Sequence, residues 1–152
     1  MRSLVLSVCL YGCETWTLTV ELQRKIQVTE MKCYRKILII RYSDRIRNEE
    51  IRQMVERSMG PQQDFLTTVK KRKLRWYGHI SRSDGMAKNI LQGIVGGVRR
   101  RRRQRKRWED NIREWTGLSF AESQRAVEDR DGWRRVIQYS LVPQRHPPDV
   151  MG

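Results

Sequence analysis

A run of positive charge in the middle of the chain sets the strongest limit on how this protein can fold. Eight of the nine residues from Arg99 to Arg107 are Arg or Lys, Gly96 and Gly97 lie just before the run, and Trp108 follows it. So many like charges cannot be buried together, because each buried cation without a partner would lose its hydration. The run must therefore lie at the surface, and the segments on either side of it have to build their own cores.

Apolar periodicity predicts helices before the run. Thr19 suits the N-cap of a first helix, Asn48 suits the N-cap of a second helix that stops at Gly60 and Pro61, and a third helix spans about residues 64–80. The buried stripe predicted for the first helix steps by three or four residues and consists of Leu22, Ile26, Thr29, Cys33, Ile37 and Ile40. The apolar stretch near residues 4–11 suits either a short strand or a truncated helix.

The pattern recovers directly after the run. Trp108, Ile112 and Trp115 follow the spacing i, i+4 and i+7, so they share one helix face. Gly117 suits the end of that helix, and residues 119–122, "SFAE", form a capping box that opens a last helix, which Gly132 interrupts.

These elements predict a mainly α fold in which small helical lobes are joined by a flexible Arg-rich segment. The predicted parts are an N-terminal helical lobe at 1–80, a flexible linker with the basic run at 81–107, a C-terminal helical hairpin at 108–140 and a disordered tail at 141–152.

The charge balance points to a polyanionic partner. The chain has 32 Lys and Arg against 17 Asp and Glu, a net charge of +15. Removing the run's eight charges leaves 15 − 8 = +7, so the rest of the chain is basic too. Arginine forks bind phosphate oxygens without reading base edges, which favours sequence-tolerant binding to RNA or DNA backbone over a solvated or import-signal role for the run. The predicted contact residues are Lys70, Lys71, Arg72, Lys73, Arg75, Arg99, Arg100, Arg101, Arg102, Arg103, Arg105, Lys106 and Arg107.

Signatures of other functions are missing from the sequence. It carries no phosphate-binding loop, dinucleotide fingerprint, metalloprotease motif or paired metal-binding aspartates, so we expect no catalysis, no metal and no cofactor. Three cysteines without paired spacing do not form a disulfide framework. The N-terminal apolar stretch lacks a signal-peptide cleavage site, and we expect a nuclear or nucleocytoplasmic protein that is neither secreted nor inserted in a membrane.

The order of the motifs resembles a known family. "LYGCETWTLT", "RNEEI", "TVKKRKLRWYGHISR", the arginine run, "RKRWEDNIREWTGLS" and "AVEDRDGWRR" follow one another over roughly residues 4–137. This succession resembles the region after the polymerase core in the reverse transcriptases of non-LTR (LINE-type) retrotransposons, which also encode an endonuclease.

The resemblance implies a non-catalytic C-terminal piece that helps to hold template RNA or target DNA, with a full-length retrotransposon enzyme as a candidate partner. Family members often break the basic run with Gly or Pro. Here it continues through Arg101, Arg102 and Arg103, which favours plain backbone binding over minor-groove insertion. The alternatives are a decayed, partly unfolded retroelement remnant with no selected function and a secreted basic peptide.

Overall fold

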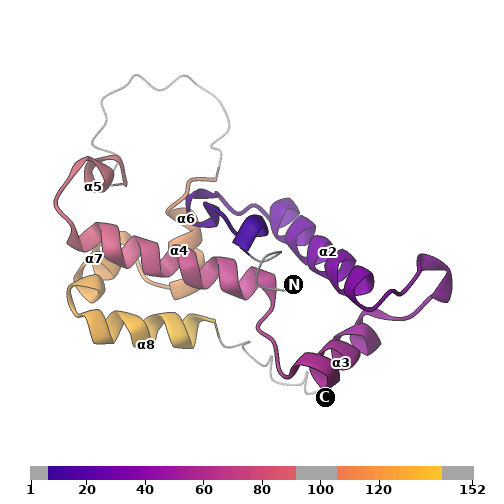
Figure 1. The fold of residues 1–152 in the computed structure, drawn as a ribbon. Coiled ribbons are helices and arrows are strands. Elements are labelled where there is room, and N and C mark those ends of the chain that lie inside the picture. Colours follow the sequence, from indigo (N-terminus) through magenta and orange to yellow (C-terminus); the bar gives the residue numbers. More distant parts are fainter. Residues whose placement is uncertain (1–6, 92–105, 142–152) are drawn as a thin grey trace, which may run out of the picture. The chain divides into compact units, whose positions relative to one another are not determined.

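The computed structural model describes residues 7–91 and 106–141, and these residues are mainly helical (Figure 1). No strand occurs among them, which confirms the predicted mainly α class. Residues 7–9 are helical, so the described end of the N-terminal apolar stretch is helix and not strand. The elements that follow are η1 (Cys13–Thr15), α2 (Val20–Ile37), η2 (Tyr42–Asp44), α3 (Asn48–Met59), α4 (Phe65–Arg82), α5 (Met86–Leu91), α6 (Asp110–Thr116), α7 (Phe120–Glu128) and α8 (Arg130–Ser140).

The chain divides into two compact units, Met1–Arg72 and Lys73–Gly152, which we call the N-terminal and C-terminal units. We predicted that the first lobe would end at residue 80, whereas the division falls inside α4. The reason is that Leu74 and Tyr77 belong to the core of the C-terminal unit. The predicted linker also differs, because residues 81 and 82 complete α4 and Met86–Leu91 form α5. Residues 92–105 of that linker and the tail from residue 142 lie outside the described residues.

Helix α2 begins where the sequence predicts. The Thr19 side chain accepts a hydrogen bond from the Leu22 amide at 3.2 Å, which satisfies one of the free N–H groups of the first turn. The buried face differs from the predicted stripe: Thr29 is exposed and Ile37 is 36% exposed, whereas Glu30, Met31 and Tyr34 are buried. Met31 and Tyr34 form a core with Ile51 and Val55 of α3. The buried face of α2 is therefore turned away from the stripe that apolar periodicity predicts.

Gly60 and Asp64 determine the connection from α3 to α4. Helix α3 ends at Met59, and Gly60 at φ 76° takes a backbone conformation that residues with a Cβ rarely adopt, which confirms the predicted end. The Asp64 carboxylate then accepts from the Thr67 amide at 3.0 Å and begins α4.

Trp133 lies at the centre of the C-terminal unit. It is 2% exposed and packs with Leu74, Tyr77, Ile112, Val127 and Ile137. Its indole Nε1 donates to the Leu74 carbonyl at 3.0 Å, so the ring has both an apolar contact and a fixed polar one.

The predicted caps of the last helices are confirmed, but their division is not. Gly117 ends α6 at φ 70°, and Ser119 and Glu122 form the capping box of α7. The single last helix predicted from the sequence is two helices, and the break lies at Asp129 rather than at Gly132. The Asp129 carboxylate accepts from the Asp131 amide at 3.0 Å and so caps α8, while Gly132 lies in the first turn of that helix.

A substitution at Gly78 tests the packing around Trp133. A Cβ at this position would lie 2.5 Å from Trp133 Nε1 and 2.6 Å from Cδ1, and the ring is held by its hydrogen bond to Leu74. We expect Gly78→Ala to lower the free energy of unfolding of the C-terminal unit by about 1–3 kcal/mol, as for other overpacked cores. Urea unfolding followed by tryptophan fluorescence measures this, because four of the five tryptophans belong to that unit.

Gly85→Ala is the matched control. A Cβ there meets nothing within 4 Å, so the free energy of unfolding should stay within about 0.5 kcal/mol of that of the parent or rise slightly. Equal midpoints for the two variants would show that Trp133 moves aside without cost.

Candidate nucleic-acid interface

The basic run joins the C-terminal unit through a fixed turn. The Arg107 amide donates to Asp110 Oδ2 at 2.6 Å, the Lys106 ammonium pairs with the Glu114 carboxylate, and Arg107 Nη1 lies 3.8 Å from Glu109 Oε1. These three acids lie in or just before α6. The last two cations of the run are therefore held against the folded unit, although each ion pair is partly exposed and contributes little to stability.

Trp108 fixes this turn to the core. Its ring meets Trp76 edge to face with centroids 5.3 Å apart and lies 6.2 Å from Tyr77. The face predicted to be shared by Trp108, Ile112 and Trp115 packs on the core as expected, since Ile112 is buried and the two tryptophans are partly buried against the same cluster. Arg99, Arg100, Arg101, Arg102, Arg103 and Arg105 lie outside the described residues.

Lys73 is the main correction among the predicted contact residues. It is 0% exposed, so it does not present its charge to a phosphate. Its Nζ donates to Asn111 Oδ1 at 2.8 Å and lies 4.3 Å from the ring centroid of Trp108 and 5.6 Å from that of Trp115. Position 73 lies one helical turn from both Val69 and Tyr77, which are themselves fully buried, and this spacing places it on the buried face.

The environment of Lys73 favours loss of its proton. Burial lowers the pKa of this ammonium to about 7, and the neighbouring charge of Lys106 acts in the same direction. The indole faces and the Asn111 carbonyl oppose the shift, because both stabilise the charged form. The side chain thus titrates near neutral pH inside the core of the C-terminal unit.

The other predicted cations of α4 differ in how accessible they are. Lys70 and Lys71 are half-buried and Arg75 is exposed. Arg72 is exposed as well, but its guanidinium donates to the Leu10 carbonyl of the N-terminal unit at 3.1 Å and so has a structural role. His79 and Arg82 were not among the predicted contact residues, although they follow Arg75 at i+4 and i+7 and so lie on its face of α4. The same helical spacing could have predicted them.

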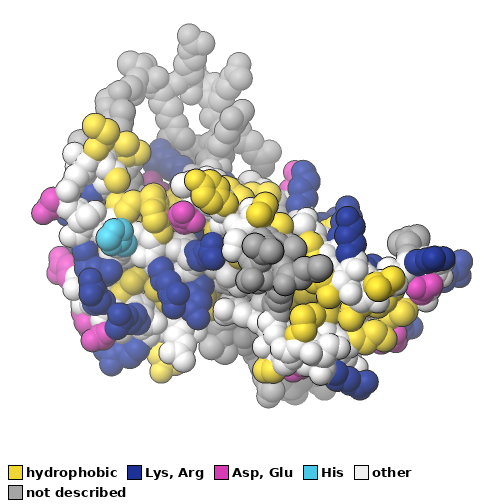
Figure 2. All heavy atoms as spheres, viewed as in Figure 1, with side chains coloured by type: hydrophobic (Ala, Val, Ile, Leu, Met, Phe, Trp, Pro, Cys, Tyr) yellow, Lys and Arg dark blue, Asp and Glu magenta, His cyan; other side chains and the backbone are white. Residues whose placement is uncertain are grey.

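Figure 2 shows Lys and Arg side chains gathered on the C-terminal unit where α4 and α8 run, with a histidine among them. Several of these cations already have partners. Arg134 pairs with Asp131 at 2.9 Å, Arg135 lies 3.8 Å from Asp129, and Arg82 donates to the Val127 carbonyl at 2.8 Å. Arg75 has no ion pair among the described residues, which leaves its guanidinium available to an external anion.

Within 7–91 and 106–141, no three His, Cys, Asp or Glu side chains lie together as metal ligands would. None of the helices described there combines the length and the apolar character that a membrane crossing requires.

Comparison with known proteins finds a similarity to a transposon-derived protein. The chain is 28% identical over 151 residues to an uncharacterized transposon-derived protein of Caenorhabditis elegans, in an alignment that covers 90% of this chain and 52% of that protein. The chain thus spans about half the length of this relative. No family model and no solved structure matches the chain.

The buried ammonium of Lys73 predicts a pH-dependent stability. Its pKa is about 7 in the fold, below its ordinary value of 10.5, so between these pH values the unfolded chain binds a proton that the folded chain does not. The free energy of unfolding of the C-terminal unit should therefore rise with pH above about 7, by up to about 1.4 kcal/mol per pH unit. Urea titrations at several pH values, followed by tryptophan fluorescence, measure this slope.

Lys73→Met removes the titrating group while keeping the length of the side chain. The slope should disappear in this variant and persist in Lys88→Met, whose ammonium is partly exposed and pairs with Asp84. A slope that survives in Lys73→Met would assign the pH dependence to another group.

Proposed function

We propose that this protein binds the sugar-phosphate backbone of RNA or DNA without sequence preference. The binding residues in this proposal are the arginines of the basic run together with exposed cations of the C-terminal unit, above all Arg75 and Arg107. The observation that carries it is the anchoring of the run's end, because Trp108 packs on Trp76 and Tyr77 and fixes Lys106 and Arg107 beside α6.

Anchoring the end of the basic run to the folded unit affects how the run can bind phosphates. Cations next to a folded unit are held at a fixed point, so phosphate contacts by the run and by the surface of the unit can form together. Each contact releases condensed counterions, and affinity then depends steeply on salt. Arginine supplies most of the run, which suits forked contacts to phosphate oxygens.

The ancestry we propose is more specific than the similarity to a transposon-derived protein. We infer that the chain derives from the region after the polymerase core of a non-LTR retrotransposon reverse transcriptase, because its motifs follow the order of that family. Its role would be accessory and non-catalytic, holding template RNA or target DNA in the nucleus or cytoplasm, with a full-length enzyme as partner.

A salt series on the arginine run tests the proposal. Binding of a single-stranded RNA and of an unrelated DNA duplex is measured by fluorescence anisotropy for the parent and for a variant with Arg99, Arg100, Arg101, Arg102 and Arg103 changed to Ser. We expect the variant to bind more weakly. The slope of log K against log salt should be shallower by up to about 0.9 per lost contact on duplex DNA and about 0.7 on single strands.

The matched control removes five exposed arginines from the N-terminal unit, Arg24, Arg41, Arg45, Arg47 and Arg57, again to Ser. Its slope should stay close to that of the parent. Equal losses in the two variants would show diffuse attraction to the net charge, and no binding by the parent near physiological salt would favour a retroelement remnant without a binding function.

A pair of substitutions on α4 tests the contribution of the folded surface. Arg75→Met should weaken binding and make the salt slope shallower by less than about one unit, because one exposed cation is lost. Lys73→Met, two residues away on the same helix, should leave the slope unchanged because its ammonium is buried. A larger effect from Lys73 than from Arg75 would contradict the assignment of the binding face.

A further inference from the structure

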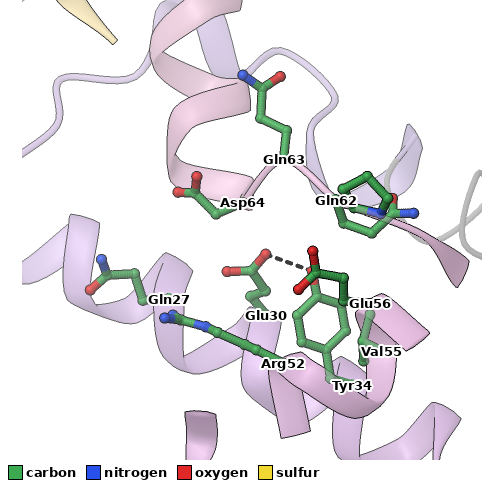
Figure 3. A pocket seen from close by; sticks show the side chains of 10 residues that line it. Gln27, Glu30, Tyr34, Arg52, Val55, Glu56, Gln62, Gln63 and Asp64 are labelled. Atoms are coloured by element: carbon green, nitrogen blue, oxygen red, sulfur yellow. Dashed lines mark hydrogen bonds between the residues drawn. The ribbon is translucent and has the colours of Figure 1, made fainter. Parts of the chain in front are cut away.

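A pocket in the N-terminal unit differs in charge from the rest of this basic protein. Its volume is about 430 Å³, and it lies between α2, α3 and the segment that leads into α4. Glu30, Glu56 and Asp64 contribute three carboxylates to its lining, and Arg52 contributes the one cation (Figure 3). The remaining polar lining consists of the Tyr34 hydroxyl and three glutamine side chains, which both donate and accept hydrogen bonds.

Glu30 is the residue that points to a ligand. It is 1% exposed, and its Oε1 accepts from the Tyr34 hydroxyl at 2.9 Å and from the Phe65 amide at 3.0 Å. Its second oxygen, Oε2, is buried and has no hydrogen-bond partner among the described residues. Figure 3 shows the carboxyl group of Glu30 within the pocket, with the side chains of Gln27, Arg52 and Asp64 around it. A buried acceptor without a donor costs free energy, which a donor supplied by a ligand would recover.

The lining selects the chemistry of that ligand. Acceptors outnumber fixed donors, and the formal charge of the four ionisable residues is 1 − 3 = −2. Val55 and Pro61 add apolar wall, which suits the methylene stem of an amphipathic cation. We propose that this pocket binds an organic cation with N–H donors, a guanidinium or an alkylammonium group, which donates to Glu30 Oε2. The source is either a basic side chain of another protein or a free polyamine.

Binding of such a cation should be linked to release of a proton. Burial raises the pKa of Glu30, and Asp64 adds to this, whereas the bonds from Tyr34 and Phe65 and the charge of Arg52 act in the opposite direction. An ammonium or guanidinium beside Oε2 stabilises the ionised carboxylate, so the bound protein holds fewer protons. Affinity should therefore increase as the pH rises through the raised pKa of Glu30, because the carboxylate that the cation pairs with is then already ionised.

Nuclear magnetic resonance on the full chain tests this proposal. The amide signal of Phe65 is a local reporter, because this N–H donates to Glu30. Titration with N-acetylarginine amide and, separately, with spermidine should shift this signal and the side-chain amide signals of Gln27 and Gln62, with saturation at a Kd of about 1 mM or tighter. A response to the arginine derivative alone assigns the pocket to a basic side chain, and a response to spermidine alone assigns it to a polyamine.

Tetramethylammonium chloride is the control ligand, since its cation carries the same single charge as N-acetylarginine amide without an N–H donor. It should leave the Phe65 signal unchanged at equal ionic strength. Shifts of equal size with this salt would overturn the proposal, and so would the absence of a saturable response to both N–H donors.

Two variants separate binding from folding. Glu30→Gln keeps the size of the side chain and an oxygen for Tyr34 and Phe65, and it should weaken binding at least tenfold. Glu21→Gln removes an exposed carboxylate of α2 outside the pocket and should bind as the parent does. Undiminished binding by a folded Glu30→Gln would overturn the assignment of Glu30, with folding checked by the unfolding midpoint.

Discussion

The close contact between Gly78 and the indole of Trp133 is the constraint on which the C-terminal unit depends. Helix α4 carries a glycine where the ring lies, and one turn earlier the Leu74 carbonyl accepts the indole proton. This contact joins α8 to α4, two helices separated in sequence by the whole basic run. The buried pair of Tyr77 and Ser123, whose hydroxyl oxygens lie 2.7 Å apart, adds α7 to the same side of the unit. The core thus combines an apolar cluster with polar contacts between residues far apart in the sequence.

That closed core explains how a strongly basic segment can be part of a folded protein. The tryptophan that follows the run packs on α4, and acids in or just before α6 hold the last two cations at the surface. Lys73 lies beneath them, with its ammonium against two indole faces. Its burial costs free energy, and the proximity of Lys106 adds to that cost. The pKa of Lys73 falls to about 7 as a result, so the unit can shed this internal charge near neutral pH.

Local signals in the sequence were sufficient for several ends of helices and insufficient for their buried faces. Two ends were missed, since Arg47 and not Asn48 is the N-cap of α3 and the break at Asp129 was not predicted. Thr19, Gly117 and the Ser119 capping box were predicted correctly, because a cap depends only on residues a few positions apart. Lys73 was misjudged because its residue type suggests exposure, and the buried carboxylate of Glu30 was not predicted, although helical spacing places both residues on buried faces. Their partners lie 35 and 38 positions along the chain, at Phe65 and Asn111, and no local pattern announces such pairs. The division of the chain inside α4 escaped prediction for the same reason.

Glu30 and Lys73 give the two units opposite responses to pH. Glu30 has a raised pKa, so its contribution to the stability of the N-terminal unit is fully present below the ordinary glutamate value of 4.5 and is lost as pH rises through the folded pKa. Lys73 has a lowered pKa, so its contribution to the C-terminal unit is fully present above 10.5 and is lost as pH falls toward about 7. Through these two groups, low pH therefore stabilises the N-terminal unit and high pH stabilises the C-terminal unit. A cation bound beside Glu30 would reverse the first of these trends, because it stabilises the carboxylate that the empty pocket disfavours.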